Sequence, residues 1–471
     1  MTTFVPMRKA SWMTQSTFLT SCMDAPSSDR NGLFSTATIS HAGADHKSHL
    51  GTSAILGIEI PVERGSRVRN HQDSLRNESI GSLLFRLSFP AALGMAVQAS
   101  YSVVDAFFVG WGVGHEGIAA VSMALPLQML LMAAAQTLGV GGASLLSRSL
   151  GAERRKRAER TLGTLFTCTW ILGVLFAAAA IPSAPFVLYL LGAGEGVLPL
   201  AAEYTQTLFR GAPFFAFSIV ANNFVRAEGN ASFAMMTMLI SAGINTLLDP
   251  LFIFGFEWGT RGAALATVAA QVATALWLAW YYLARRSAVR LRMKNLPPRA
   301  VLLKETISVG AAAFFRQGAS SLSLIVVNGS LAAAGGGAAV AAFGIVNRLL
   351  LFAVMPVYGI VQGLLPIVGF NYGAKQFCRV LSAMRRSIAA ATLLCGAGAA
   401  VLFFAPGEAV DFFTSSPEVR RVGIDAARML APGMLATGFQ IMASGLFQAL
   451  GKAGPSFVLS LLRQVIFLIP L

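Results

Sequence analysis

Long apolar runs follow one another from Ile80 to the end of the chain, separated by short polar stretches. Each run is close to or above the roughly 20 residues that a helix needs to cross a bilayer core of about 30 Å. The pattern predicts an all-α, polytopic membrane protein with eleven spans. The expected spans are 83–110, 117–146, 161–182, 200–225, 233–256, 261–284, 303–329, 338–368, 386–405, 423–447 and 455–471.

Positive charge gathers in alternate loops. Segment 147–161 holds six Arg and Lys residues, 284–304 holds seven and 371–386 holds four. The loops of opposite parity, such as 110–117 and 192–196, hold none. This is the positive-inside pattern, so we expect the basic loops and the N-terminus to be cytoplasmic, in a plasma (inner) membrane.

The two halves of the apolar region resemble each other. Segment 136–152, QTLGVGGASLLSRSLGA, corresponds to 358–374, YGIVQGLLPIVGFNYGA, and each precedes a basic stretch. A looser match joins 212–232 to 431–456, and the separation stays at about 220 residues. A repeat of six helices is even-numbered, so the halves enter the membrane from the same side, as in transporters built from parallel repeats.

The repeat divides the chain into an N-lobe at 81–285, a basic cytoplasmic linker at 286–302 and a C-lobe at 303–471. The C-lobe holds five expected spans against six in the N-lobe. We therefore expect an incomplete second bundle, with eleven of twelve helices, in a sequence that stops short of the last one.

Residues 1–80 contain no long apolar run and are predicted to be a disordered tail. They are either a targeting segment or the product of a misassigned start. The net charge of +15 does not indicate a nucleic-acid partner, because the basic residues occupy alternate loops rather than one soluble face. The four cysteines show no metal or redox spacing.

Two carboxylates interrupt the apolar runs of the first half. Nine acidic residues lie between 81 and 260, and only Asp105 and Asp249 fall well inside a span. An ionisable group at that depth costs a few kcal/mol and usually faces a cavity in which it functions. The alternative is a structural polar contact between helices.

Helix geometry places several polar groups at the same depth as these carboxylates. Asp105, Asp249 and Thr267 lie roughly 8–12 Å below the outer ends of their helices. Asn245 is one turn from Asp249 on the same face. Pro250 has no N–H, which frees the carbonyl oxygen of residue 246. Such an oxygen cluster can hold a proton or a small hard cation such as Na⁺ at Asp105, Asn245, Asp249 and Thr267, and the sequence does not choose between them.

Two further residues lie along the first span. Gln98 is seven residues before Asp105, on the same face, and either contacts a substrate or bonds a neighbouring helix. Pro90 either marks the start of the helix or, from an interior position, makes a point at which it bends. Between Glu305 and Glu408 the chain has no acidic residue, so the expected chemistry lies in the first lobe.

The stretches SFPAALGMAVQASYSVVDAFFVGWG, RAEGNASFAMMTMLISAGINTLLDPLFIF and GTRGAALATVAAQ resemble the multidrug and toxic compound extrusion (MATE) family, in its DinF-like branch. The resemblance implies twelve helices in two pseudo-symmetric six-helix bundles arranged as a V. It also implies antiport of amphipathic, often cationic compounds against H⁺ or Na⁺. By the same resemblance, Asp105 and Asp249 carry the cation with Asn245 and Thr267 as polar partners, Gln98 lines the substrate cavity and Pro90 bends helix one.

Two other functions remain as alternatives. A lipid-linked precursor flippase of the same superfamily would need cationic residues for a pyrophosphate, and the first lobe offers two acids. An intramembrane aspartyl protease would use two buried aspartates, but its characteristic YD and GxGD stretches are absent. No P-loop or zinc motif is present, so we expect secondary transport without catalysis, cofactor or resident metal, by a monomer.

Overall fold

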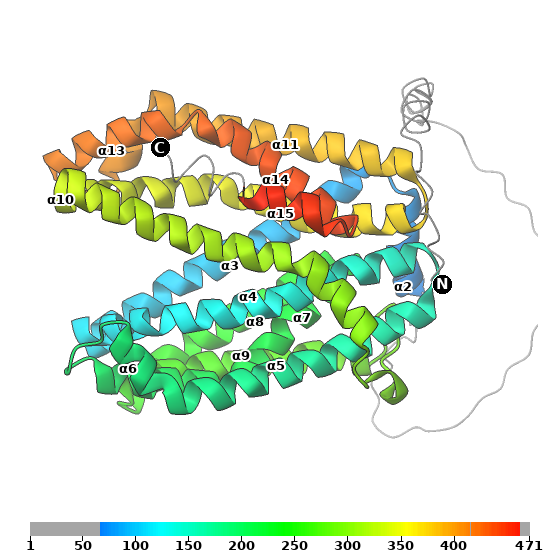
Figure 1. Cartoon of the computed structure of the whole chain (residues 1–471), viewed down its shortest axis with the longest axis horizontal. Helices are drawn as coiled ribbons and strands as arrows, with labels where there is room; N and C mark the ends of the chain where they lie inside the picture. The colour runs from blue at the N-terminus through cyan, green and yellow to red at the C-terminus, as the bar shows by residue number, and fades with distance from the viewer. Residues whose placement is uncertain (1–65, 415, 462–471) are drawn as a thin grey trace, which may run out of the picture. The chain divides into compact units, whose positions relative to one another are not determined.

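The computed structural model describes residues 66–414 and 416–461, and every regular element in those ranges is helical. The all-α expectation is therefore confirmed (Figure 1). The helices are α2 (Ser66–Asn77), α3 (Ile80–Val113), α4 (His115–Gly151), α5 (Arg155–Leu190), α6 (Leu198–Arg210), α7 (Ala212–Ala227), α8 (Ala231–Pro250), the π-helix η1 (Leu251–Gly255), α9 (Gly259–Leu283), the 3-10 helix η2 (Met293–Asn295), α10 (Ala300–Gly373), α11 (Phe377–Phe404), α12 (Pro406–Asp411), α13 (Pro417–Leu430), α14 (Gly433–Ala449) and α15 (Ala453–Leu461).

Two expected spans are each bent pairs of helices. The fourth consists of α6 and α7, and the tenth consists of α13 and α14, with a bend of 53° in both pairs. Each bend falls at a Gly–Pro neighbourhood, around Gly211 and around Pro432. Among the described residues, seven helices are long and apolar enough to cross a membrane, or nine when each bent pair is one span. The expected span 303–329 lies in the first arm of α10, and most of 455–471 lies outside the described residues.

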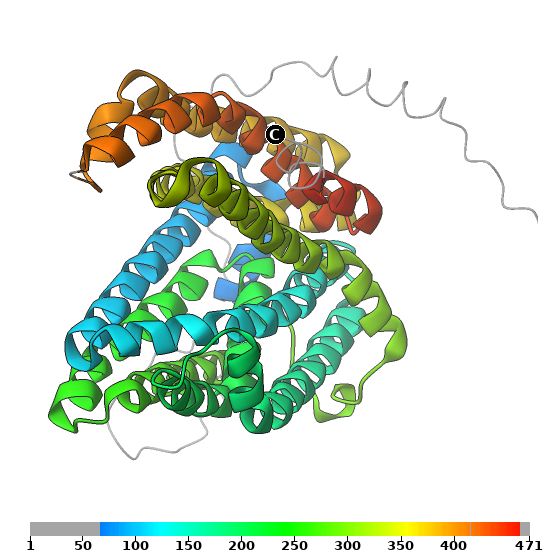
Figure 2. The same cartoon turned by 60° about the vertical axis from the view of Figure 1, so that its left-hand side comes forward.

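Helix α10 contains two expected spans as two helical arms that meet at a kink. Its backbone leaves helical geometry at Gly336, where φ is +62° and ψ is −158°. Positive φ is accessible to glycine because it has no Cβ. The chain therefore reverses direction there, and α10 consists of a first arm before Gly336 and a second arm after it (Figure 2).

The two lobes meet through glycines. A Cβ built on Gly151 at the end of α4 would lie 1.9 Å from the carbonyl oxygen of Phe370, and one on Gly373 would lie 2.1 Å from that of Arg148. Gly151 and Gly373 occupy equivalent places in the aligned segments 136–152 and 358–374. The contact is thus reciprocal about the pseudo-symmetry axis, and only a residue without a side chain permits such an approach between helices.

A second pair of close crossings repeats this arrangement. Gly310 on the first arm of α10 packs on the carbonyl of Thr137, and Gly141 packs on that of Thr306. On the other side of the axis, Gly359 and Gly363 of the second arm pack against Ala92 and Ser88 of α3. The repeat relates α4 to the second arm of α10, and α3 to the first arm. The contact of α4 with the first arm is therefore equivalent to the contact of the second arm with α3.

One end of the molecule carries the basic segments 147–161, 284–304 and 371–386 and is called the basic end. Polar bonds join the two lobes there, beside the contact of Gly151 and Gly373. The Ser144 hydroxyl lies 2.6 Å from the carbonyl oxygen of Gln448. Arg157 pairs with Glu305 at 2.5 Å, and Arg148 approaches the same carboxylate at 3.6 Å. The lobes are therefore closed against each other at the basic end.

The expected disordered tail is wrong for residues 66–77, which form α2; residues 1–65 lie outside the described residues. Leu75 is 1% exposed and packs near Gly229 in the turn after α7. From the C-lobe, Asn371 donates to the carbonyl oxygen of Leu75 at 3.1 Å, and Arg379 donates to that of Glu78 at 2.7 Å. Helix α2 thus contacts both lobes at the basic end, which the polar composition of this segment did not indicate.

A buried carboxylate fastens the turn between α7 and α8. Glu228 accepts hydrogen bonds from the Ser287 hydroxyl at 2.6 Å, the Tyr281 hydroxyl at 3.1 Å and the Ala288 amide at 3.0 Å. Burial raises the pKa of this carboxyl to about 7, and the three hydrogen bonds oppose the shift. The turn is therefore anchored to the basic end of α9.

Replacing Gly373 with Ala should destabilise the protein by about 1–3 kcal/mol, because the new methyl group would force the lobes apart at the Arg148 carbonyl. The measurement is the fraction of monodisperse protein after heating in detergent. Gly243→Ala is the control, since a Cβ there meets nothing within 4 Å and alanine favours a helix by roughly 0.5–1 kcal/mol. Equal stability of the two variants would contradict the close-packing account.

Glu228 should make stability depend on pH in a defined window. Because the folded pKa of about 7 lies above the ordinary value of 4.5, the folded state holds more protons between these values, and stability falls as pH rises from about 4.5 to 7. Glu228→Gln should flatten that part of the profile, measured as melting temperature against pH. An unchanged slope in the variant would show that another group titrates there.

Candidate functional site

Three of the predicted site residues lie together inside the first lobe. Asp249 is 0% exposed and Asn245 is 2% exposed, both on α8. The Asn245 amide nitrogen donates to Oδ1 of Asp249 at 3.4 Å and to the Thr267 hydroxyl of α9 at 3.3 Å. One amide thus links the carboxylate and the hydroxyl across two helices, as the one-turn spacing of Asn245 and Asp249 indicated.

Asp105 completes the cluster from α3. Its carboxyl group lies close enough to that of Asp249 for the two to interact, so carboxylates that are far apart in sequence meet in one site. The close packing of α3 on α8 allows this, because Gly94 leaves room for Met235 and Met238 of α8. The structure therefore brings together all four predicted cation-site residues.

Three oxygen atoms of this cluster are buried without a hydrogen-bond partner among the described residues: Oδ1 of Asp105, Oδ1 of Asn245 and Oδ2 of Asp249. Leaving a buried acceptor unsatisfied costs about 1–3 kcal/mol. Other partnerless buried polar atoms occur elsewhere in the described residues, but here three acceptors gather in one cluster, which favours a species that supplies positive charge. Two carboxylates, an amide oxygen and a hydroxyl fit a proton or a small hard cation, which prefers oxygen ligands.

The backbone beyond Asp249 departs from the α-helix. Pro250 ends α8, and Leu251–Gly255 form the π-helix η1. Proline cannot donate the next helical hydrogen bond, and π-helical turns often occur at functional sites. Gly112 of α3 and Gly262 of α9 allow close approach to Ile253 and Phe252 in this turn. The wide turn is thus enclosed by the same two helices that supply Asp105 and Thr267.

Two tyrosines belong to the site and were missed in the sequence. Tyr101 of α3 lies beside Gln98 and is close enough to both carboxyl groups to interact with them electrostatically. Tyr204 of α6 is buried, and it lies close enough to Asp105 and Asp249 for the charges of both carboxylates to act on its hydroxyl group. Tyr101 precedes Asp105 by one helical turn, so the helical period could have identified it. Tyr204 comes from a separate helix, and its sequence neighbourhood carries no comparable signal.

Gln98 and Pro90 lie on the same helix at increasing distance from the carboxylates. Gln98 is partly buried and lies beside Tyr101. Pro90 lies inside α3, ten residues after its start, so the interior position is the correct one of the two alternatives. The carbonyl of residue 86 therefore lacks its helical partner. Fifteen residues separate Pro90 from Asp105, or about 22 Å along the axis.

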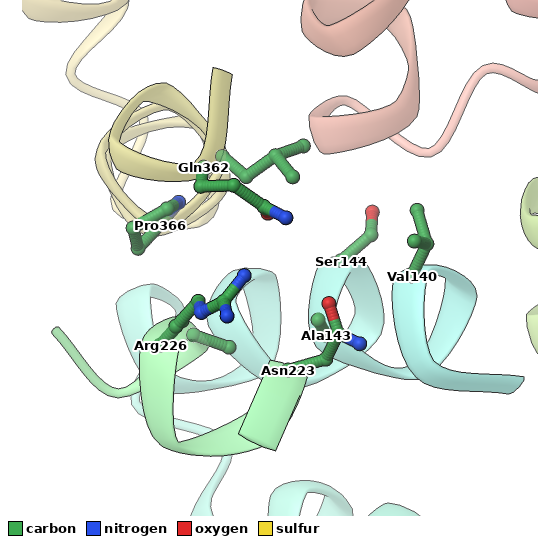
Figure 3. A pocket seen from close by; sticks show the side chains of 9 residues that line it. Val140, Ala143, Ser144, Asn223, Arg226, Gln362 and Pro366 are labelled. Atoms are coloured by element: carbon green, nitrogen blue, oxygen red, sulfur yellow. The ribbon is translucent and has the colours of Figure 1, made fainter. Parts of the chain in front are cut away.

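A second polar region lies nearer the basic end, where α4, α7 and the second arm of α10 enclose a pocket (Figure 3). Arg226 and Asn223 come from α7, Ser144 from α4 and Gln362 from α10. Arg226 is 7% exposed and was not among the predicted site residues. It lies one residue before the end of α7, a place where a charged side chain is ordinary and gives no sequence signal.

Two lobes of repeated helices with buried carboxylates between membrane-spanning segments define a multi-pass membrane transporter. The family model MatE matches residues 90–251 and again 312–471, and the two matches begin about 220 residues apart. The chain therefore belongs to the MatE family. The expected family and the internal repeat are both confirmed, and because the family consists of transporters, the chain is not an enzyme and the protease interpretation is excluded.

Relatives and solved structures agree with this assignment. The chain is similar to the multidrug export protein MepA of Staphylococcus aureus (strain MRSA252), with 27% identity over 82% of this chain and 85% of that protein. Crystal structures of MATE in the straight and bent conformations match with TM-scores of 0.79 and 0.80, each at 29% identity. They cover 84% and 85% of this chain and 88% of each solved chain, and confirm the expected fold of two pseudo-symmetric bundles.

Asp249→Asn should raise the melting temperature by a few degrees. The amide can donate to the Asp105 carboxyl group and removes one of two acidic groups that contact each other in a buried site. Thermal unfolding in detergent measures this. Asp411→Asn is the control, because Asp411 is exposed and paired with Arg420 at 2.5 Å, so its loss gives no gain. A lower melting temperature for Asp249→Asn would show that the carboxylate stabilises the fold.

Proposed function

We propose that this protein is a secondary antiporter that exports amphipathic or cationic small molecules, including drugs, in exchange for inward-moving H⁺ or Na⁺. The observation that carries the proposal is the cluster of three partnerless buried oxygen atoms on Asp105, Asn245 and Asp249. The export of drugs by the MepA relative supports the direction and the class of substrate.

The coupling site consists of Asp105, Asp249, Asn245 and Thr267. Two contacting carboxylates in an apolar wall repel each other strongly when both are ionised. A proton bound by one of them, or a sodium ion held among the oxygen atoms, removes that repulsion. Tyr101 and Tyr204 supply the polar groups next to the pair. The charge of the first lobe therefore follows the occupancy of the coupling site.

Helix α3 converts this change of charge into movement. It carries Asp105 and packs against α8 of the N-lobe, and it also packs against the second arm of α10 in the C-lobe. Pro90 is the point at which α3 bends, because the helix lacks one hydrogen bond there. When the cation neutralises Asp105 and Asp249, α3 shifts toward α8 and displaces the substrate from the cavity beside Gln98. The solved straight and bent conformations support a two-state fold.

The cellular setting follows from the loops. The basic end faces the cytoplasm, with the N-terminus on the same side, in the plasma membrane. The closed basic end then corresponds to a state that is shut toward the cytoplasm. The protein acts as a monomer, and the carboxylates that lie well inside its spans, Asp105 and Asp249, belong to the first lobe, as in the DinF-like branch.

The alternative function is flipping of a lipid-linked precursor. A pyrophosphate group carries several negative charges and calls for several cations. The pocket between α4, α7 and α10 is lined by one arginine, and the coupling cluster is acidic. These features favour export of amphipathic molecules over flipping of a pyrophosphate.

Uptake of a fluorescent organic cation into everted vesicles, whose cytoplasmic face is outward, tests the proposal, with a proton or a sodium gradient imposed in separate runs. We expect transport with one of the two gradients, and at least a tenfold lower rate in Asp105→Asn and Asp249→Asn, since removing a coupling carboxylate abolishes exchange. Pro90→Ala should bind the dye normally and transport it more slowly.

Glu257→Gln is the matched control, because Glu257 is an exposed carboxylate eight residues from Asp249. It should transport like the unchanged protein. Full gradient-driven transport by Asp249→Asn would refute the role of this carboxylate, and transport that needs no gradient would refute antiport.

A further inference from the structure

Arg226 is a buried cation without a charged partner among the described residues. It is 7% exposed, and no carboxylate of the described chain lies within ion-pair distance of it. Within the described residues its guanidinium donates from Nη2 to the sulfur of Met238 at 3.8 Å, and a thioether is a weak acceptor. Glu228 is close in sequence, but its oxygens are bound to Tyr281, Ser287 and Ala288.

The side chain of Arg226 also points the unusual way. An arginine near the end of a membrane helix normally extends toward the interface. Arg226 instead reaches Met238, which is seven residues, or about 10 Å, into α8 from its first residue. Burying an unpaired guanidinium is costly, so a ligand that restores its pairing is the simplest reason for this direction.

The guanidinium group points into the pocket and toward α10, and the side chain of Gln362 points back from α10 (Figure 3). Asn223 lines the same wall, with its amide nitrogen bonded to Gln136 and to the Ile219 carbonyl. Ser144 is already bonded to Gln448 and Ala449. The groups left to receive a ligand are thus the guanidinium donors and the amide of Gln362, a set that suits a carboxylate.

We infer that this pocket binds the anionic group, of carboxylate type, of a transported molecule. The inference rests on the proposed export function and extends it: the protein would accept zwitterions, with the anionic group at Arg226 and the cationic part nearer the acidic cluster. The wall is shared by α4 and α7 of the N-lobe and α10 of the C-lobe. Separation of the lobes at the basic end therefore opens the pocket to the cytoplasm, from which an exported molecule enters.

Two dyes of one scaffold test this: a rhodamine-type dye with a free carboxylate, and its ethyl ester. Binding is measured by fluorescence anisotropy to the full chain in nanodiscs of zwitterionic lipid. Arg226→Gln should weaken binding of the carboxylate dye about tenfold to a hundredfold, the usual range for a charge-assisted hydrogen bond, and leave the ester within about threefold. Arg226→Lys should restore most of the affinity, and Gln362→Leu should weaken only the carboxylate dye.

Arg210→Gln is the control, because Arg210 is an exposed arginine at the end of α6 and should leave both dyes unaffected. Sulfate added to the unchanged protein should displace the carboxylate dye and not the ester, which keeps the test valid if Arg226→Gln does not fold. Equal weakening of both dyes, or no effect of sulfate, overturns the inference alone. Absence of binding of either dye to the unchanged protein overturns the export proposal together with it.

Discussion

The arrangement of this protein depends on the contact of helix backbones at the basic end. Gly151 and Gly373 lie where any side chain would collide with a carbonyl oxygen of the other lobe, and Gly141 and Gly310 do the same one crossing away. In a bilayer there is little hydrophobic gain from joining helices, so association comes from close packing and from polar bonds between them. The ion pairs on Glu305 and the bond from Ser144 add to this contact. The position of every lobe-spanning group, including the pocket around Arg226, follows from it.

The two halves share a backbone plan and differ in chemistry. The repeat supplies reciprocal glycines, a kinked or bent span in each half and the same direction through the membrane. The buried acids occur in the first half, with the two carboxylates, the amide and the tyrosines converging from α3, α6, α8 and α9. One lobe therefore carries the charge that changes, and the other provides a surface against which it moves. One coupling site in one lobe is enough for an exporter, because coupling requires only a site whose occupancy changes the free-energy difference between two conformational states.

The sequence predicted the spans of the described residues and the pairing of Asn245 with Asp249 because both depend on short-range periodicity. Asp105 and Thr267, on other helices, were placed with them by their similar depth below the helix ends. A run of apolar residues fixes a membrane helix, and the spacing of Asn245 and Asp249 fixes a shared face. Three features escaped that reasoning. Arg226 sits at a helix end, where charge is ordinary, and only the direction of its side chain makes it unusual. Tyr204 reaches the carboxylates from a separate helix through tertiary packing. Helix α2 is polar in composition, and its order comes from contacts that both lobes make with Leu75 and its neighbours.

The contacts that hold helix α2 limit which sequence changes this segment can accept. Asn371 and Arg379 bind the main-chain oxygens of Leu75 and Glu78, and the side chain of Leu75 packs beside Gly229. A further side-chain attachment is an exposed ion pair from Arg76 to Glu153 at 3.2 Å. A main-chain oxygen is present whatever the residue, so substitution at most positions of this segment leaves the attachment intact. Insertion or deletion of a single residue between Leu75 and Glu78 changes the spacing of the two carbonyl oxygens that Asn371 and Arg379 bind. The segment is therefore tolerant of amino-acid substitutions and intolerant of insertions or deletions.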